Sequence, residues 1–162
     1  MSTRGGGDGP WAGCGTHTRW TRLRTVVNWL NLSTPVGLLA ARAGGASVHP
    51  IGRGVLVATG WRWRRVGVDA TTVGSVVLTP RDVAWLRARP ALVRHEDRHV
   101  TQYAWLLGPV LLPLYLLAAA VSWVATGDTA SWNPFERTAG LVDGGYRPAR
   151  TRWSRRRRSP SP

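Results

Sequence analysis

The stretch from residue 100 to residue 127 contains no charged side chain, although the whole chain carries 22 basic and eight acidic residues. Its centre, residues 109–125, consists almost entirely of Leu, Val, Ala and aromatic residues. A helix of this length reaches about 25 Å, slightly less than the roughly 30 Å of bilayer hydrocarbon. The segment therefore predicts either a core helix or a helix in contact with a membrane, and the rest of the chain must fold around it.

The residues on both sides of this stretch predict an α+β chain. Runs of β-branched residues at 55–59 and 71–79, interrupted by glycines and a basic cluster, are typical of two or three strands. Ser33 and Thr34 predict a helix cap ahead of Pro35, and Asp82 and Asn133 predict caps further along. The expected helical segments are 35–42, 82–89, 91–107 and 134–142. The predicted architecture is a small β segment followed by a helical hairpin.

The length of 162 residues predicts one domain with two loose ends. Residues 1–20 are Gly-rich and lack periodicity, so we expect a flexible segment, and the Arg/Ser/Pro-rich residues 148–162 predict a disordered tail. Residues 21–147 then form the single domain. The lone Cys14 excludes an intrachain disulfide and a multi-Cys zinc site. No apolar run follows the first basic residues, so we expect no cleavable signal peptide.

An HExxH pattern at residues 95–99 is the motif that carries chemistry. His95 and His99 lie four residues apart, which on a helix puts both imidazoles on one face, where one cation can bind both. Glu96 can then take a proton from a metal-bound water. The alternative is a pair of solvated histidines between Arg94 and Arg98, with Glu96 as an ordinary surface partner for arginine. We favour a site for one zinc ion, although iron or another divalent ion also suits such ligands.

Glu136 is the candidate third ligand. The chain contains only two Glu, Glu96 and Glu136, so carboxylates of this length are not scattered over its surface. In an antiparallel hairpin that turns near Gly108, the second helix is level with His95 again about thirteen residues after the turn, and Glu136 follows within reach. A full membrane span would instead place Glu136 on the opposite side of the bilayer from the histidines. We therefore predict a hairpin that is buried in the protein or dips partly into a membrane.

Three further side chains are candidates for the surroundings of the metal. Gln102 and Tyr103 lie three and four residues after His99 on the same helical face, and we expect Tyr103 to serve packing. Tyr146, in a glycine-rich turn, could donate a hydrogen bond to an oxyanion. Nothing in the sequence brings Tyr146 near the metal.

Two segments resemble known zinc enzymes. HEDRHVTQY at 95–103 and NPFERTAG at 133–140 resemble the HExxH and ExxA halves of gluzincin-type zinc metallopeptidases, in which the second Glu completes the site. The order of HExxH helix, apolar helix and ExxA is also similar to that of the much larger membrane-associated endopeptidases of the CAAX-prenyl-protease kind. Together with NLSTPVGLLAAR and TVGSVVLT, these segments resemble small bacterial proteins of unknown function, a family without an established substrate.

The resemblance implies a zincin-like fold and a metallopeptidase-like domain. His95, His99 and Glu136 would be the zinc ligands, a water would take the fourth position, and Glu96 would be the general base. The implied activity is hydrolysis of a peptide or amide bond in a peptide or protein substrate.

One departure from the peptidase pattern concerns the carboxylate that holds a ligating imidazole. The peptidases commonly continue ExxAD, whereas Gly140 stands at the corresponding place in this chain. Asp143 could substitute by accepting an imidazole N–H, as metal-bound histidines usually require. The alternative, which we favour for Asp143, is a turn residue before Gly144.

Two other functions compete with hydrolysis. The arginines of residues 150–158 and the Trp/Arg cluster at 61–65 could contact phosphates, but no nucleic-acid-binding motif accompanies them, so the sequence disfavours a nucleic-acid partner. A basic tail beside the apolar stretch equally suits contact of residues 109–125 with anionic lipids at a cytoplasmic membrane surface. The third interpretation is a structural zinc site without catalysis. We expect a cytoplasmic protein or one associated with the cytoplasmic face of a membrane, and the sequence leaves its oligomeric state open.

Overall fold

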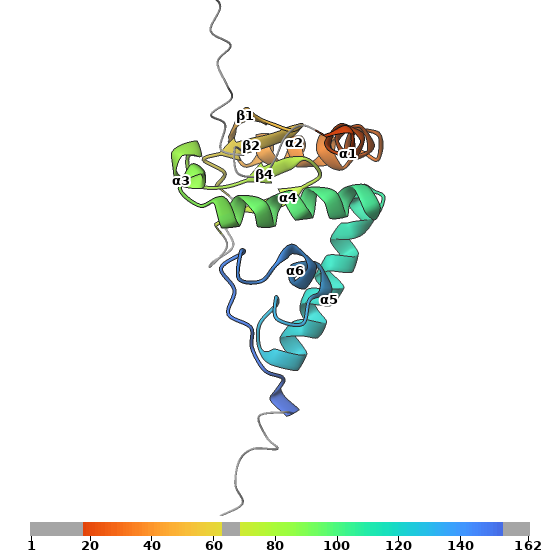
Figure 1. Cartoon of the computed structure of the whole chain (residues 1–162), viewed down its shortest axis with the longest axis vertical. Coiled ribbons are helices and arrows are strands. Elements are labelled where there is room, and N and C mark those ends of the chain that lie inside the picture. The colour runs from red at the N-terminus through yellow and green to blue at the C-terminus, as the bar shows by residue number, and fades with distance from the viewer. Residues whose placement is uncertain (1–17, 63–68, 154–162) are drawn as a thin grey trace, which may run out of the picture.

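The chain folds into an α+β structure with a small four-stranded sheet, seen in a computed structural model that describes residues 18–62 and 69–153 (Figure 1). The helices and strands follow one another as α1 (Arg19–Leu30), α2 (Ser33–Ala43), β1 (Ser47–Gly52), β2 (Val55–Thr59), β3 (Thr71–Val73), β4 (Val76–Leu78), α3 (Val83–Arg87), α4 (Pro90–Trp105), the 3₁₀ turn η1 (Gly108–Val110), α5 (Leu111–Thr126) and α6 (Pro134–Ala139).

The sheet lies between two helical layers. Its strand order is β1-β2-β4-β3, in which β2 and β4 pair in parallel and the two outer pairs are antiparallel. Val57 and Val77 pack with Val93 and Val100 of α4 on one face, while Val76 packs toward α2 on the other. Because both faces are covered, all three residues of β4 are buried. This apolar core fixes α4 beneath the sheet.

The predicted elements are found, with differences at their edges, and α1 is a further helix that the sequence analysis did not predict. The two predicted β-rich runs contain three strands, and β1 adds a fourth strand ahead of them. α1 begins at Arg19, so the predicted flexible segment ends earlier than expected, and its residues 1–17 lie outside the described part. Asp82 and Asn133 cap α3 and α6 as predicted. At α2 the N-cap is instead Leu32.

The hydroxyls of Ser33 and Thr34 explain why neither residue caps α2. Ser33 donates to the carbonyl of Asn28 at 3.1 Å, and Thr34 accepts from the backbone N–H of Ser75 at 3.2 Å. Both hydroxyls therefore connect α2 to neighbouring elements. The cap prediction considered only the start of α2, whereas the bond of Ser33 reaches back to α1 and that of Thr34 reaches the sheet.

The predicted antiparallel hairpin is wrong, because α5 leaves the end of α4 at a steep angle and runs away from the sheet (Figure 1). Leu107 and Gly108 both have positive φ, at 55° and 81°. Gly108 also packs closely on the loop after α1, where an added Cβ would lie 2.6 Å from the carbonyl oxygen of Asn31. This contact directs the chain away from α4. The short helix α6 fills the resulting angle and packs against both α4 and α5.

The apolar stretch is not a buried core helix. Gly108–Thr126 has a mean hydropathy of 1.8 and is long and apolar enough to cross a membrane, by length and composition only. Only 28% of this stretch is buried in the structure. Most of its leucine and valine side chains therefore lie on the outside of the described protein.

Candidate metal centre

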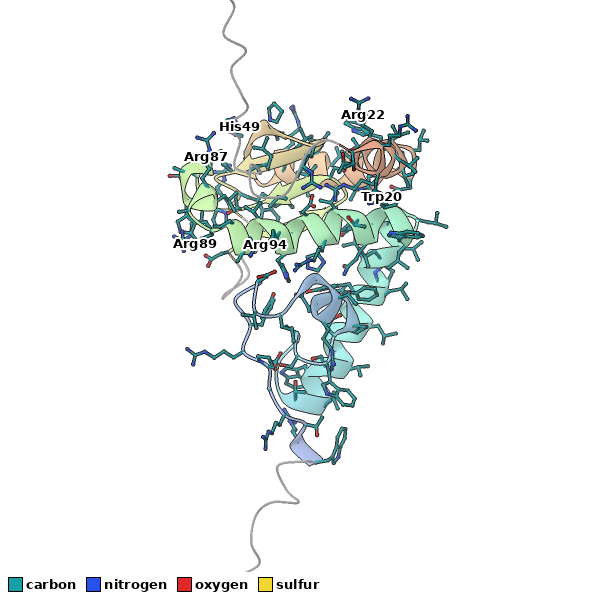
Figure 2. All side chains as sticks on the ribbon, viewed as in Figure 1. Trp20, Arg22, His49, Arg87, Arg89 and Arg94 are labelled. Carbon is teal, nitrogen blue, oxygen red and sulfur yellow. The ribbon has the colours of Figure 1, made fainter. Side chains whose placement is uncertain are left out.

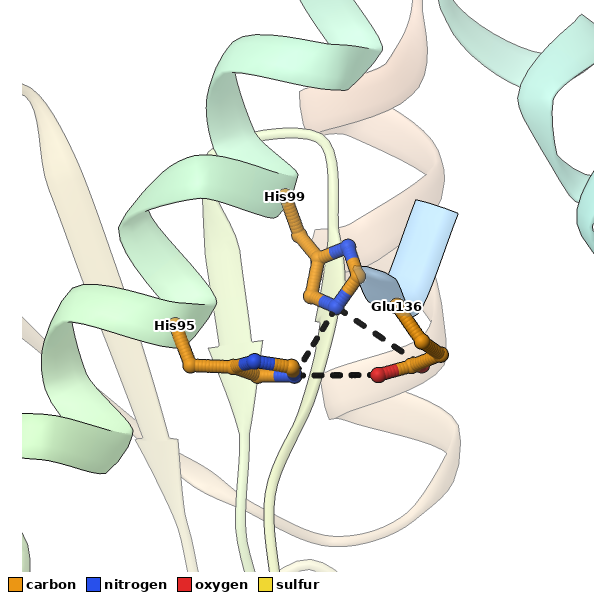
Figure 3. Close-up of side chains that lie close together, drawn as sticks. All are labelled: His95, His99 and Glu136. Atoms are coloured by element: carbon orange, nitrogen blue, oxygen red, sulfur yellow. Dashed lines mark hydrogen bonds and ion pairs between the residues drawn. The ribbon is translucent and has the colours of Figure 1, made fainter. Parts of the chain in front are cut away.

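Two elements bring three ligand side chains together. α4 presents His95 and His99 on the face turned away from the sheet, and α6 presents Glu136 opposite them (Figure 3). The Nε2 atoms of the histidines lie 3.1 Å apart. Oε2 of Glu136 lies 3.2 Å from Nε2 of His95, and Oε1 lies 3.8 Å from Nε2 of His99. The exposed fractions of His95, His99 and Glu136 are 2%, 8% and 2%, so this is a buried cluster.

A backbone carbonyl sets the orientation of His95. Nδ1 of His95 lies 3.1 Å from the carbonyl oxygen of Gly140. A carbonyl oxygen only accepts, so Nδ1 must carry the hydrogen. The lone pair of the neutral imidazole is then on Nε2, which points at His99 and Glu136.

The side chain of Gln102 sets the orientation of His99. Nδ1 of His99 lies 2.8 Å from Oε1 of Gln102. The Gln102 amide nitrogen donates to the carbonyl of Phe135 at 2.8 Å and to the hydroxyl of Thr138 at 2.9 Å, which fixes the orientation of the amide. Oε1 of Gln102 therefore accepts from Nδ1–H of His99, and the lone pair of His99 also faces inward. Gln102, a candidate for the surroundings of the metal in the sequence, thus lies in contact with His99.

The donor set fits a metal ion. Two imidazole lone pairs and a carboxylate converge on one point, and Oε2 of Glu136 is buried without a hydrogen bond. Only a cation, either a proton or a metal ion, can satisfy all three groups. Tetrahedral coordination with bonds of 2.0–2.1 Å places ligand atoms about 3.3 Å apart, close to the separations found here. His95, His99 and Glu136 can thus hold a metal ion, as the sequence predicted.

The pKa values of the cluster reflect the same arrangement. Burial opposes the charge on Glu136, but the adjacent imidazoles of His95 and His99 outweigh burial and hold its pKa well below the usual range. Burial likewise opposes protonation of His99, yet Glu136 and Glu96 together raise its pKa above the ordinary value. Without a metal, a proton is therefore stabilised at this point, and a metal ion must displace it.

Tyr115 is a member of the site that the sequence analysis missed. From α5, its hydroxyl donates to Oε1 of Glu136. Burial and the charge of Glu136 raise the pKa of Tyr115, so the hydroxyl stays protonated and remains a donor. The available signal was a single tyrosine within a Leu-rich helix, since a buried tyrosine usually finds a partner for its O–H.

Glu96 lies on a different side of α4 from the ligands. Its carboxylate accepts a hydrogen bond of 2.6 Å from the hydroxyl of Thr72, in β3 at the edge of the sheet. It also borders a small apolar cavity between α4 and the sheet, which Val93 helps to line. Glu96 is therefore not a ligand of the cluster, but its charge is near enough to act on His99.

The segment after α6 covers the histidines. Gly144 packs directly on His95, and a Cβ there would lie 2.6 Å from Cε1 of the imidazole. The ring of Tyr146 follows, with its centroid 6.1 Å from that of His95. Burial raises the pKa of Tyr146, with a further contribution from Glu136. The structure thus brings Tyr146 beside the candidate ligand His95, which the sequence could not do.

Asp143 does not hold an imidazole N–H. Its carboxylate binds the guanidinium groups of Arg98 at 2.8 Å and Arg94 at 3.5 Å, and Arg98 in particular lowers the pKa of Asp143. The positions that Asp143 could have taken on the histidines are occupied by Gly140 and Gln102. Asp143 instead attaches the covering segment to α4.

The basic segments that could bind phosphates are only partly described. Residues 63–68 and 154–162 lie outside the described part of the chain. They include three of the five residues of the Trp/Arg cluster at 61–65 and most of the arginine-rich tail, so both predictions fall largely outside it. The start of the predicted tail is attached to the domain, because the backbone N–H of Ala149 donates to Ser131 at 2.7 Å.

Comparison with known proteins assigns no relative to this arrangement. The chain matches no protein-family model, no curated protein and no solved structure.

Proposed function

We propose that this protein is a zinc-dependent hydrolase of peptide or amide bonds, similar to the gluzincin-type metallopeptidases. The observation that carries the proposal is the convergence of two imidazole lone pairs and one carboxylate in a buried cluster. Three protein ligands leave a fourth position for water, as is typical of catalytic zinc sites. Zinc bound there would supply a Lewis acid that lowers the pKa of its water to about 7.

The chain's own residues would then have separate tasks. His95, His99 and Glu136 hold the ion, and the Gly140 carbonyl and Gln102 keep the imidazoles in the required tautomers. Glu96 is the candidate base, since it is the remaining carboxylate whose charge acts on the cluster. Its carboxylate accepts from Thr72 on another side of α4, so it would have to turn toward the cluster to reach a metal-bound water. Tyr146 is the candidate donor to the substrate oxygen.

Access to the site requires movement of the covering segment. Gly144 and Tyr146 lie over His95, and an open groove beside α6 is lined by Arg98, Arg137 and Gly140. Displacement of Gly144 toward this groove would expose the histidines to a substrate.

A structural metal site is the second candidate, and the burial of all three ligands favours it. In that case the ion would clip α6 to α4, with no role for Glu96 in catalysis. Both candidates require the metal, so they differ only in what Glu96 does.

Metal analysis and hydrolysis assays on one set of variants separate these candidates. We expect one zinc per chain in the wild type and in Glu96→Gln, and none in His95→Ala. The matched control His49→Ala changes an exposed histidine of β1 and should keep its zinc.

Cleavage of unfolded protein and of a peptide library is then measured by mass spectrometry. Loss of a general base should lower the rate in Glu96→Gln by at least about a hundredfold. If the wild type and Glu96→Gln both bind zinc but the wild type cleaves nothing, the result supports a structural zinc site. No zinc in the wild type would contradict both candidates.

A further inference from the structure

The first helix, α1, has its apolar side facing outward. Trp20, Leu23, Val26 and Leu30 recur at steps of three and four residues, and all of them are exposed, Leu30 by 77%. The buried residues of the helix are Thr21, Arg24 and Asn28. A helix on a water-soluble protein shows the opposite distribution.

Specific polar contacts hold this reversed orientation. Arg24, only 2% exposed, forms an ion pair with Asp97 of α4 and donates to Thr101 at 2.9 Å. Asn28 donates to the carbonyl of Val100 at 3.0 Å. Since these partners are fixed on α4, the helix cannot rotate its leucines inward without breaking the buried ion pair.

The long helix α5 repeats this distribution. Its buried side consists largely of small or polar residues, among them Ala119, Ser122 and Thr126. Leu114, Leu117, Val121 and Val124 recur at three- and four-residue steps on the outside, and Leu117 is 65% exposed. The two helices therefore turn their larger apolar side chains away from the protein.

These two outward faces are joined at the corner between α4 and α5. The centroid of the Trp20 ring lies 5.6 Å from that of Trp105, the last residue of α4. This contact links α1 to the end of α4, and Figure 2 shows Trp20 between them. Trp105 and Leu107 are themselves more than two-thirds exposed. We call the face marked by Leu23, Leu30, Trp105, Leu107, Leu117 and Val121 the outer apolar surface.

The charged residues around the outer apolar surface indicate what kind of partner it fits. Neither α1 nor the stretch Gly108–Thr126 contains an acidic residue. Arg19 and Arg22 are exposed on α1, and at the far end of α5 the Arg152 guanidinium lies 5.7 Å from the ring of Trp123. Arginine and tryptophan at the borders of an apolar surface are typical of the interface between lipid headgroups and hydrocarbon.

We infer that the outer apolar surface inserts into one leaflet of an anionic lipid bilayer, with the arginines at its borders among the headgroups. α5 would lie along the leaflet instead of crossing the membrane, because α6 packs on its other side with Arg137 and Thr138 exposed. A crossing helix would draw these polar groups into hydrocarbon. The inference does not depend on the metal centre.

Vesicle flotation of the full chain tests this inference. The wild type should float with vesicles of phosphatidylcholine and phosphatidylglycerol, and float less with phosphatidylcholine alone. Leu23→Gln and Leu117→Gln should each lower the partition coefficient by about tenfold or more, because each removes one inserted side chain. Both positions are exposed, so the variants should keep the thermal stability of the wild type.

Val142→Gln is the matched control, since Val142 is even more exposed than Leu23 and Leu117 but lies in the turn after α6, outside the outer apolar surface. It should bind vesicles like the wild type. Wild-type binding by Leu23→Gln and Leu117→Gln would overturn the inference, and so would a wild type that binds neither vesicle. Self-association that the same two variants abolish, with no vesicle binding, would assign the surface to a second copy of the chain.

Discussion

The helices α4 and α5 are both 16 residues long, yet they differ in the side chains that they bury and in where their larger apolar side chains lie. α4 buries His95, Glu96 and His99 together with valines, whereas α5 buries mainly small and polar residues and exposes leucines. On α4 each buried polar group has a defined partner. The difference indicates that α4 is built to hold a polar site inside the protein, whereas α5 turns its apolar side chains outward.

The largest effect should come from removing the ligand that α6 contributes. Glu136→Ala leaves two imidazoles without the carboxylate, and we expect the zinc affinity to fall by more than about a hundredfold, since loss of a ligand should exceed the 10- to 100-fold effect of losing an outer-shell partner. Isothermal titration with zinc measures this loss. Asp69→Ala, which removes an exposed acidic residue outside the cluster, is the control. Equal affinity in Glu136→Ala and the wild type would show that α4 binds the ion without α6.

Truncations of one apolar residue on each helix test the difference in burial directly. Val100 of α4 is fully buried, and Val100→Ala should lower the free energy of unfolding by about 2 kcal/mol. Leu117→Ala on α5 removes more atoms, but from an exposed side chain, and should change stability by no more than about 0.5 kcal/mol. Denaturation without lipid measures both. A larger loss for Leu117→Ala would mean that α5 is covered in solution.

Tyr115 is the point at which α5 contributes to the site on α4. Tyr115→Phe removes the hydroxyl that donates to Glu136 and should lower the zinc affinity by about tenfold, with little change in fold. Tyr103→Phe is the control, because Tyr103 is a buried tyrosine of α4 that is not part of the hydrogen bonds to Glu136. Unchanged affinity in Tyr115→Phe would separate α5 from the metal centre.

The smallest expected effect is a change in the stability of the metal-free protein with pH. The raised pKa of His99 contributes stability that is present below its ordinary value and is lost as the pH rises through the raised value. The lowered pKa of Glu136 contributes stability above the ordinary glutamate range. We therefore expect the metal-free chain to lose stability as the pH rises above the ordinary histidine pKa of about 6.5. Zinc should bind more tightly over the same rise in pH, because it no longer competes with the proton.

Melting curves with chelator and with zinc across this pH range provide the measurement. His99→Gln should remove the pH dependence of the metal-free protein. The same slope in His99→Gln and the wild type would assign the dependence to another group.

The three candidate ligands were predictable because the spacing of neighbouring residues and the composition of the chain identify them. His95 and His99 have helical spacing, and Glu136 is one of two glutamates in the chain. The path that joins them was not predictable, because the direction of α5 depends on the close packing of Gly108 against Asn31. The groups that orient the imidazoles divide in the same way. Gln102 follows His99 on its helix, but a backbone carbonyl such as that of Gly140 has no signature in a sequence.

The reversed orientation of α1 was also outside the reach of the sequence. Arg24 and Asn28 have the appearance of surface residues, and their burial is favourable only because α4 offers Asp97 to Arg24 and the Val100 carbonyl to Asn28. Hydrophobic periodicity correctly predicts that a helix has an apolar face. It does not say whether that face meets the protein or something else.

The short helix α6 has a consequence for the lifetime of the chain in a cell. With six residues it is too short to persist alone, and Gln102 and the cluster at Glu136 attach it to α4. If the metal holds Glu136, then α6 and the segment that follows become accessible to proteases when the metal is withdrawn. Metal scarcity would then shorten the half-life of the chain, so that its abundance follows the supply of the ion.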